Sequence, residues 1–152
     1  MSSLKIIKEP DTRLRQKSLE IKQITANLKQ LVLDMVQTMK ANKGVGLAAP
    51  QVGQNIRLIV INLEDSPLAL INPKIPWKSL RKEIEEEGCL SCPNKYGLVK
   101  RSKIIHIKAL NSEGKKISFK AEGLFARVIQ HEIDHLDGIL IIDKFVKQKR
   151  YS

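Results

Sequence analysis

The stretch RVIQHEIDHLDG, residues 127–138, contains His131, Glu132 and His135 in the order H-E-x-x-H. On a helix, residues four apart lie on one face, so the two histidines can hold one metal ion together. Glu132 is rotated by about 100° from His131, where its carboxylate can reach water at the ion without binding the ion. Two helical histidines that merely pack are the simpler alternative. The pattern nevertheless favours a metal site on a buried helix.

A catalytic metal site of this kind usually has three protein ligands and an open position for water. Neither common downstream arrangement fits, because Ile141 stands where a third histidine would follow and no glutamate occurs after His135. The third ligand is therefore expected upstream. The candidates there are Cys89, Cys92, His106 and the acidic residues.

Two metal arrangements compete. If both cysteines bind, the set is Cys2His2, which closes a structural zinc site and indicates an RNA- or ribosome-binding module without catalysis. If one cysteine binds, the site keeps an open position for water. The closed site would leave Glu132 without a role, and the long gap between Cys92 and His131 is unlike zinc-finger spacing. These points favour the open, catalytic site.

The order of expected elements indicates an α+β fold, with strands between two helices. Apolar residues recur at helical spacing over residues 25–42, and the H-E-x-x-H segment extends a second helix over 123–136. Strands are expected at 56–63, 68–73, 98–110 and 116–121. We expect one domain, residues 1–152, because 152 residues suit a single substantial core.

Composition narrows the class of protein. No apolar stretch is long enough to cross a membrane, and the first residues lack the apolar core of a secretory signal, so we expect a cytoplasmic protein without a membrane partner. The net charge of +11 permits an anionic partner such as RNA, although a solvated lysine-rich surface explains it as well. The basic tail, about residues 144–152, is either a contact arm or a solvated end.

Three motifs carry a resemblance to a known family. GVGLAAPQ (44–51), EGCLS (87–91) and QHEIDHLDG (130–138) resemble the signature motifs of the peptide deformylase family, in the order of that family. The resemblance runs from about residue 5 to 145. It implies antiparallel β-sheets packed around a central helix that carries H-E-x-x-H. It also implies a metal-dependent hydrolase that removes the formyl group from the N-terminal formyl-methionine of newly synthesised polypeptides and releases formate.

The resemblance assigns the reacting groups. Cys89, His131 and His135 would bind one divalent metal ion per chain, with Fe(II) as the expected native ion and zinc, nickel or cobalt as alternatives. Glu132 would move the proton of the attacking water. The side-chain amide of Gln51 and the backbone N–H of Leu90 would stabilise the oxyanion.

The resemblance also implies how the substrate binds. N-formyl-methionyl peptides and nascent chains would lie extended against the backbone, with the methionine side chain in an apolar pocket. The implied substrate-binding residues are Val45, Gly46, Gly88, Tyr96, Leu124 and Val128. Tyr96 stands where many members have an arginine that helps to hold the peptide. The expected protein is a monomer, with a ribosome contact through its basic surface as a further expectation.

Some residues depart from the family pattern. Arg127 and Glu85 stand where apolar residues are common near the methionine pocket. Cys92 also replaces an apolar residue and could form a disulfide with Cys89. Gln130 and Asp134 are expected to orient the metal ligands.

Overall fold

Two helices and seven strands make up residues 3–146, the part of the chain that the computed structural model describes. The helices are α1 (Ala26–Ala41) and α2 (Gly123–Leu136). The strands are β1 (Gly46–Ala48), β2 (Leu58–Leu63), β3 (Ser66–Lys78), β4 (Lys82–Cys89), β5 (Cys92–Ser102), β6 (Ile104–Leu110) and β7 (Lys116–Glu122). Short 3-10 turns occupy Thr12–Arg15, Ala49–Val52 and Ile141–Asp143. This composition confirms the α+β class.

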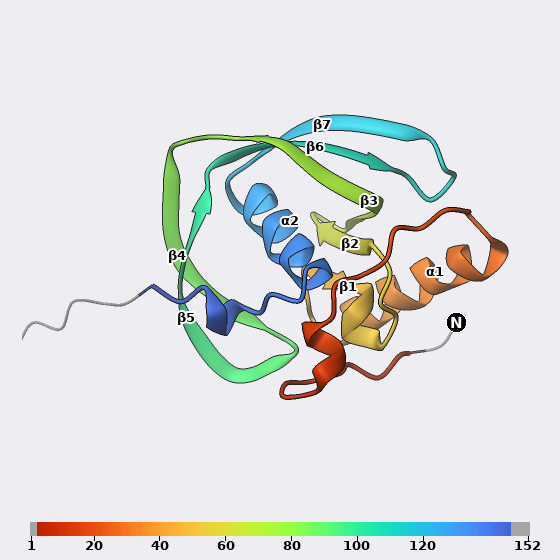
Figure 1. The fold of residues 1–152 in the computed structure, drawn as a ribbon, viewed down its shortest axis with the longest axis horizontal. Helices are drawn as coiled ribbons and strands as arrows, with labels where there is room; N and C mark the ends of the chain where they lie inside the picture. The colour runs from red at the N-terminus through yellow and green to blue at the C-terminus, as the bar shows by residue number, and fades with distance from the viewer. Residues whose placement is uncertain (1–2, 147–152) are drawn as a thin grey trace, which may run out of the picture.

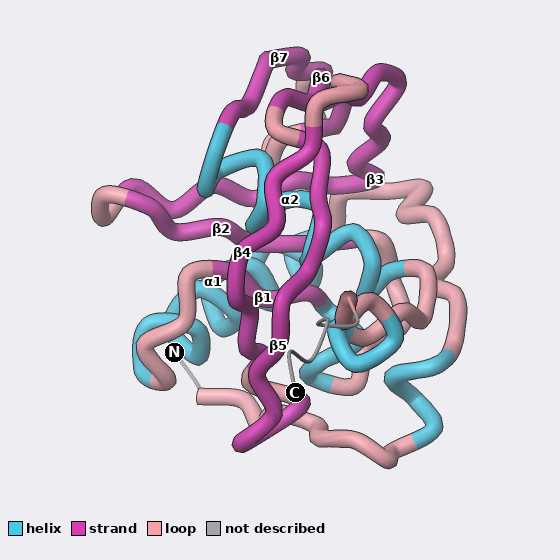
Figure 2. The backbone as a smooth tube through the Cα atoms, turned by 90° about the vertical axis from the view of Figure 1, so that its left-hand side faces the viewer, coloured by secondary structure: helices cyan, strands magenta, loops and turns pink. Residues whose placement is uncertain are grey.

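The strands form two antiparallel sheets around α2 (Figure 1). One sheet has five strands in the order β1-β2-β3-β6-β7, and the other is the β4–β5 hairpin. The long strands of the hairpin run side by side past α2 (Figure 2). The expected arrangement, antiparallel sheets packed around the helix that carries H-E-x-x-H, is confirmed.

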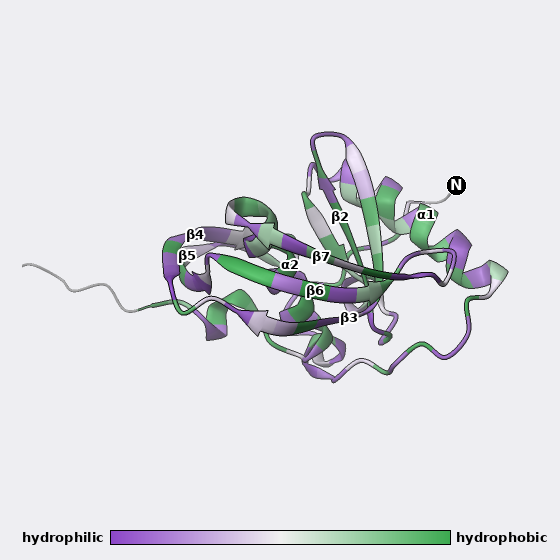
Figure 3. Cartoon of the chain, turned by 90° about the horizontal axis from the view of Figure 1, so that it is seen from above, coloured by the Kyte–Doolittle hydropathy of each residue, from purple (hydrophilic) through white to green (hydrophobic). Residues whose placement is uncertain are grey.

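Strand β2 lies between the two helices, because its alternate side chains enter different core clusters. Ile59 and Ile61 pack in the cluster of α2, whereas Leu58 and Val60 pack in the cluster of α1. The buried side chains of α1 recur at helical spacing, and its ribbon carries alternating polar and apolar bands (Figure 3). Full burial of each such aliphatic side chain stabilises the fold by about 1.5–3 kcal/mol.

Helix α2 is held at both ends by backbone geometry. It begins at Gly123 directly after β7, and the chain leaves it through Gly138 at a φ of 74°. A Cβ at Gly138 would lie 2.5 Å from the carbonyl oxygen of Arg15. Glycine therefore both stops the helix and admits the N-terminal segment against its end.

The strand expected over 98–110 is in fact two strands in different sheets. β5 ends at Ser102 and β6 begins at Ile104, so the chain changes sheet at Lys103. β4 had no sequence signal, because KEIEEEGC lacks the alternation of apolar and polar residues that marks a half-buried strand. It forms by pairing along β5 and by burying a carboxylate within an ion-pair cluster.

The expected basic tail, about 144–152, lies mostly in residues 147–152, outside the described residues. Within residues 3–146, neither helix combines the length and the apolar character needed to cross a membrane.

Candidate metal centre

Three candidate metal ligands lie close together where the end of β4 meets helix α2. Cys89 ends β4, while His131 and His135 lie one turn apart on α2. Their ligand atoms all lie within 4.8 Å of one another, and the Cys89 Sγ is 3.3 Å from the His135 Nε2. One thiolate and two imidazoles suit zinc, iron and related divalent ions. The cluster could therefore hold one metal ion.

The other two candidate ligands lie outside this cluster. His106 is on β6, where its Nε2 is 3.2 Å from the Ser118 hydroxyl. Cys92 begins β5 and is buried in a small core cluster with Leu14 and Leu140. Neither joins the group of potential ligand atoms found among residues 3–146. The geometry thus favours the open Cys-His-His set over the closed Cys2His2 set.

The Cys89 thiol is partly buried and faces a second thiol. Cys92 is its register partner across the β4–β5 hairpin, and both cysteines are free thiols. The hydrogen bond with Cys92 and burial together raise the pKa of the Cys89 thiol above its usual range. A bound cation acts in the opposite direction, because a coordinating thiol is deprotonated.

A buried carboxylate, Glu87 on β4, orients His131. Its Oε1 lies 3.0 Å from the His131 Nδ1, so the Nε2 of that ring is left for the metal cluster. Arg101 donates to both oxygens of Glu87, at 2.8 and 2.9 Å, and Arg127 donates at 2.6 Å. Burial alone would raise the pKa of Glu87, but the hydrogen bonds from Arg101 and His131 hold it well below its usual range.

The cluster around Glu87 ties three elements together. Arg101 on β5 also donates to Asp134 on α2 at 2.7 Å. Arg127 on α2 donates to the backbone carbonyls of Val99 on β5 at 2.9 Å and of Glu83 on β4 at 2.8 Å. The guanidinium of Arg127 therefore joins the helix to the hairpin that carries the cysteine ligand.

Of the two residues expected to orient the ligands, one has a different role. Gln130 exchanges two hydrogen bonds with the backbone of Ser102 and donates to the Ala126 carbonyl, so it fixes the end of β5 rather than a ligand. Asp134 affects the orientation of His131 only indirectly. It accepts a hydrogen bond from Arg101, and Arg101 in turn donates to Glu87.

Glu132 lies beside the cluster with its carboxylate buried. Its Oε2 is 3.8 Å from the His131 Nε2, and its Oε1 has no hydrogen-bond partner within residues 3–146. Burial raises the pKa of Glu132 to about 7. A Cβ at Gly46 would lie 2.6 Å from the Oε2, so only glycine lets β1 pass so close to this carboxylate.

Gln51 presents its amide to the cysteine ligand. Its Oε1 accepts from the Ala48 backbone N–H at 2.9 Å, which turns the Nε2 toward Ser91 Oγ at 3.1 Å and Cys89 Sγ at 3.6 Å. The fully buried Ser91 hydroxyl donates to the Ile7 carbonyl at 2.7 Å. Leu90 and Ser91 form the turn between Cys89 and Cys92. The amide is thus fixed in one orientation.

A cavity of about 370 Å³ opens onto the cluster. It is lined by all six residues expected to bind substrate, and by Gln51, Leu90, Glu132, His131 and Cys89. Val45, Leu124 and Tyr96 are exposed at 46%, 58% and 68%, so its mouth presents apolar and aromatic surface to solvent. Arg127, the expected departure, lines the cavity with its guanidinium engaged by Glu87.

Sequence reasoning missed the residues that hold the ligands. Glu87, Arg101 and Ser91 were not singled out, although Glu87 and Ser91 begin and end the motif EGCLS. No single-sequence signal separates Glu87 from its neighbours Glu85 and Glu86. Only the tertiary contacts of Glu87 with Arg101 on β5 and with Arg127 and His131 on α2 distinguish it from them.

Known proteins share both the sequence and the fold. A sequence model of the polypeptide deformylase family matches residues 3–151. Over 143 residues the chain is 47% identical to a peptide deformylase of Dictyoglomus thermophilum, covering 94% of this chain and 93% of that protein. It is 44% identical over 145 residues to a peptide deformylase of Desulforudis audaxviator, covering 95% and 94%.

Two solved structures extend the likeness to three dimensions. The crystal structure of peptide deformylase from Thermotoga maritima matches with a TM-score of 0.95 and 40% identity, covering 97% of this chain and all (100%) of that one. A peptide deformylase from Synechococcus elongatus, in complex with actinonin, matches with a TM-score of 0.92 and 43% identity, covering 95% and 80%.

Proposed function

The chain belongs to the polypeptide deformylase family, and from this premise we propose that it removes the formyl group from the N-terminal formyl-methionine of new polypeptides, releasing formate. The observation that carries the proposal is the meeting of Cys89, His131 and His135 with Glu132 at one end of a peptide-sized cavity. A closed structural site would need no such cavity and no buried carboxylate beside it.

Cys89, His131 and His135 would hold one divalent ion, with Fe(II) as the expected native ion and zinc, nickel or cobalt as alternatives. When bound, the ion supplies Lewis acidity that lowers the pKa of a water molecule and polarises the formyl oxygen. Glu87 orients one of the three ligands, because its contact with the His131 Nδ1 fixes the ring so that the Nε2 faces the cluster.

Glu132 moves the proton. Its carboxylate takes a proton from the water that attacks the formyl carbon and delivers it to the amine nitrogen that leaves with the peptide. Its unpartnered Oε1 leaves one oxygen available for this role.

Two fixed donors stabilise the oxyanion that develops on the formyl oxygen. They are the Nε2 of Gln51 and the backbone N–H of Leu90. The hydrogen bonds of the Gln51 amide to Ala48 and Ser91 support this role, because they fix the amide before substrate binds. A preorganised donor needs little rearrangement during the reaction.

The peptide is bound as an added strand on the free edge of β1. Because the Val45 carbonyl accepts from the Asn62 N–H of β2 at 2.8 Å, the backbone groups of the next residue, Gly46, point to the other edge of β1. Gly88 lines the same cavity from β4. An extended peptide therefore has backbone partners on both sides.

The methionine side chain enters the apolar part of the cavity. Val45, Leu124 and Val128 line it, and Tyr96 stands at the rim in place of an arginine. The flexible thioether of methionine fills such an irregular apolar space well. Arg127 bounds this space with its side chain, while its charge is neutralised by Glu87.

We place the activity in the cytoplasm, on nascent chains, in a monomeric protein. The net charge of +11 supports a contact between the basic surface and ribosomal RNA, because phosphate backbones attract clustered lysine and arginine.

Formate release from formyl-Met-Ala-Ser by anaerobically purified protein tests the proposal. We expect activity in the parent and in Cys92→Ser, and a loss of at least about 100-fold in Glu132→Gln with the metal still bound. Metal content is measured on each variant. No formate release in any metal form, together with metal loss in Cys92→Ser, would mean a closed structural site instead.

A further inference from the structure

The outer face of β3, β6 and β7 carries lysines and an exposed tryptophan. Alternate side chains of β6 and β7 point away from α2, because those between them, such as Ile105, Ile107 and Ala121, are buried in the core against that helix. Figure 3 looks from above onto these three strands, which Figure 1 shows lying across α2. The outward residues thus form one solvent-facing surface.

The strand register sets these residues in two rows. Lys74, Lys108 and Ser118 are cross-strand partners in one row. The next row consists of the partners Trp77, His106 and Lys120. Lys116 is the first residue of β7 and lies beyond Ser118 on the side away from Lys120. Register shifts on either side of Lys74 bring both it and Trp77 to the outer face.

The surface is cationic. Within residues 3–146, no ion pair joins Lys74, Lys108 or Lys116 to an acid, whereas Lys120 pairs with Glu122 at 3.1 Å. The same three lysines line a surface hollow of about 540 Å³, in which Glu20 is the one acid. Unpaired lysines held on a rigid sheet at fixed spacing are suited to a chain of phosphates.

Trp77 gives this surface an aromatic platform. It is 54% exposed and is the one tryptophan of the chain. A large aromatic ring left in solvent beside lysines matches the surfaces that bind single-stranded nucleic acid, where bases stack on rings and cations follow the backbone.

We propose that the outer face of β3, β6 and β7 is a binding surface for single-stranded RNA. A base stacks on Trp77, and the phosphates on one side of that base lie along Lys74, Lys108 and Lys116. The Ser118 hydroxyl, 3.2 Å from the His106 Nε2, offers a hydrogen-bonding group to a ribose 2′-hydroxyl. This contact favours RNA over DNA.

The surface is separate from the candidate metal centre. None of its residues lines the cavity at the cluster, and the sheet itself stands between the two, with α2 on the inner side. RNA binding and deformylation can therefore be lost independently, and each has its own measurement.

A ten-nucleotide oligouridine added to the metal-loaded, full-length protein tests the proposal, with Trp77 fluorescence as the readout. We expect saturable quenching, with a Kd on the order of 1–100 µM, and weaker binding as salt rises. The double variant Lys74→Ala/Lys108→Ala should bind about tenfold more weakly, and its slope of log K against log salt should fall by about 1.4.

The matched control is Lys5→Ala/Lys29→Ala, which removes the same charge from exposed residues of other elements. Equal weakening in this control would mean diffuse charge attraction and would overturn the proposal. Trp77→Leu, followed by anisotropy of labelled RNA, should weaken binding at least fivefold. Quenching that is absent while RNA binds would place the RNA elsewhere on the protein.

Two further outcomes would also overturn the assignment. An oligothymidine of equal length that binds as tightly as the RNA would remove the preference for RNA. Anionic lipid vesicles that quench Trp77 while RNA does not would indicate a membrane surface instead. All variants should release formate at the parental rate, so failure of deformylation bears on the proposed function alone.

Discussion

Glu87 is the residue on which the ligand geometry depends most. A carboxylate this deeply buried is stable only when paired, and here two guanidinium groups and one imidazole surround it. Its negative charge in turn keeps the His131 ring in a single orientation. Arg127 is part of this cluster, which explains how an arginine is accommodated in the wall of the cavity.

We predict that Glu87→Gln weakens metal binding by about 10- to 100-fold, because the neutral amide holds the His131 Nδ1 less strongly. Competition of the purified protein against a chelator measures this affinity. Glu85→Gln serves as the control, since Glu85 is exposed and reaches Arg127 only at 3.9 Å. Equal metal affinity in Glu87→Gln and the parent would contradict the role assigned to Glu87.

We predict that Gly46→Ala lowers kcat strongly while metal content stays unchanged. The added Cβ would lie 2.6 Å from the Glu132 Oε2 and 2.9 Å from a Val128 methyl group, so the carboxylate must move. Gly88→Ala is the comparison, because its Cβ would meet the exposed ring of Tyr96 at 2.5 Å, and that ring can turn away. Steady-state kinetics should show the larger kcat loss in Gly46→Ala.

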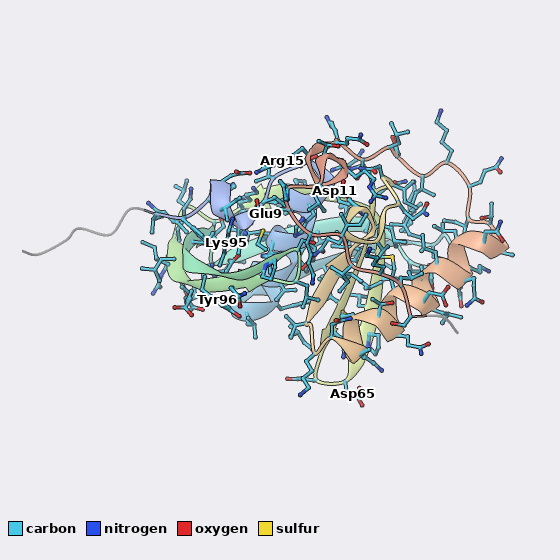
Figure 4. All side chains as sticks on the ribbon, turned by 90° about the horizontal axis from the view of Figure 1, so that it is seen from below. Glu9, Asp11, Arg15, Asp65, Lys95 and Tyr96 are labelled. Atoms are coloured by element: carbon cyan, nitrogen blue, oxygen red, sulfur yellow. The ribbon has the colours of Figure 1, made fainter. Side chains whose placement is uncertain are left out.

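At the level of elements, the β4–β5 hairpin and α2 work as a unit. The hairpin places Cys89 at its turn, and α2 brings both histidines to it. The molecule also has exposed ion pairs, among them Glu9–Lys95 and Arg15–Asp143, and Figure 4 shows Glu9, Lys95 and Arg15 on one side of it. Such exposed pairs contribute little to stability, so the buried hydrogen bonds of Arg127 dominate the docking of the hairpin.

We predict that Arg127→Met destabilises the protein by about 2–4 kcal/mol. It leaves the carbonyls of Val99 and Glu83 unpaired and removes one cation from Glu87, although the methionine retains much of the packing. Urea unfolding of metal-loaded protein measures the change. Glu85→Gln should differ from the parent by less than about 0.5 kcal/mol. A similarly small change in Arg127→Met would show that Arg101 alone holds the hairpin.

At the level of the whole molecule, a metal ion held by the proposed ligands would link distant parts of the chain. The ligands come from the end of β4 and from α2, and α2 also contacts β1 and β2 of the larger sheet. An ion that binds only when these elements are in place stabilises the entire fold.

We therefore predict that chelation of the metal lowers the Tm by about 5–10 °C. An ion at about 100 times its Kd contributes about 2.7 kcal/mol, and a protein of this size shifts by about 2–4 °C per kcal/mol. Scanning calorimetry with and without added divalent ion measures the shift. Cys89→Ala should show no dependence on added ion, and a dependence equal to that of the parent would place the ion elsewhere.

The sequence by itself determined the helix that carries His131, Glu132 and His135, because helical spacing alone puts the histidines on one face. It also limited the third ligand to upstream residues and, through the three motifs, indicated the family. The helix is a local feature, since it depends on residues within one or two turns of one another, and each motif is a short run of sequence. Of the predicted cavity-lining residues, Val45, Gly46 and Gly88 stand within the motifs, and the others followed from the wider resemblance to the family.

The family resemblance implied Cys89 rather than Cys92 as the third member of the cluster, and the tertiary structure brings Cys89 to the two histidines. Only the tertiary structure decided that Glu87 rather than Gln130 orients His131 and that Arg127 is neutralised. It alone also revealed β4, the break at Lys103 and the lysine rows beside Trp77. Each of these depends on contacts between different elements, and an acidic strand such as β4 has no apolar alternation from which it could be predicted. Strand alternation puts Glu85 and Glu87 on one face of β4 and Glu86 on the other, and contact with Arg127 and His131 of α2 buries Glu87 while Glu85 stays in solvent.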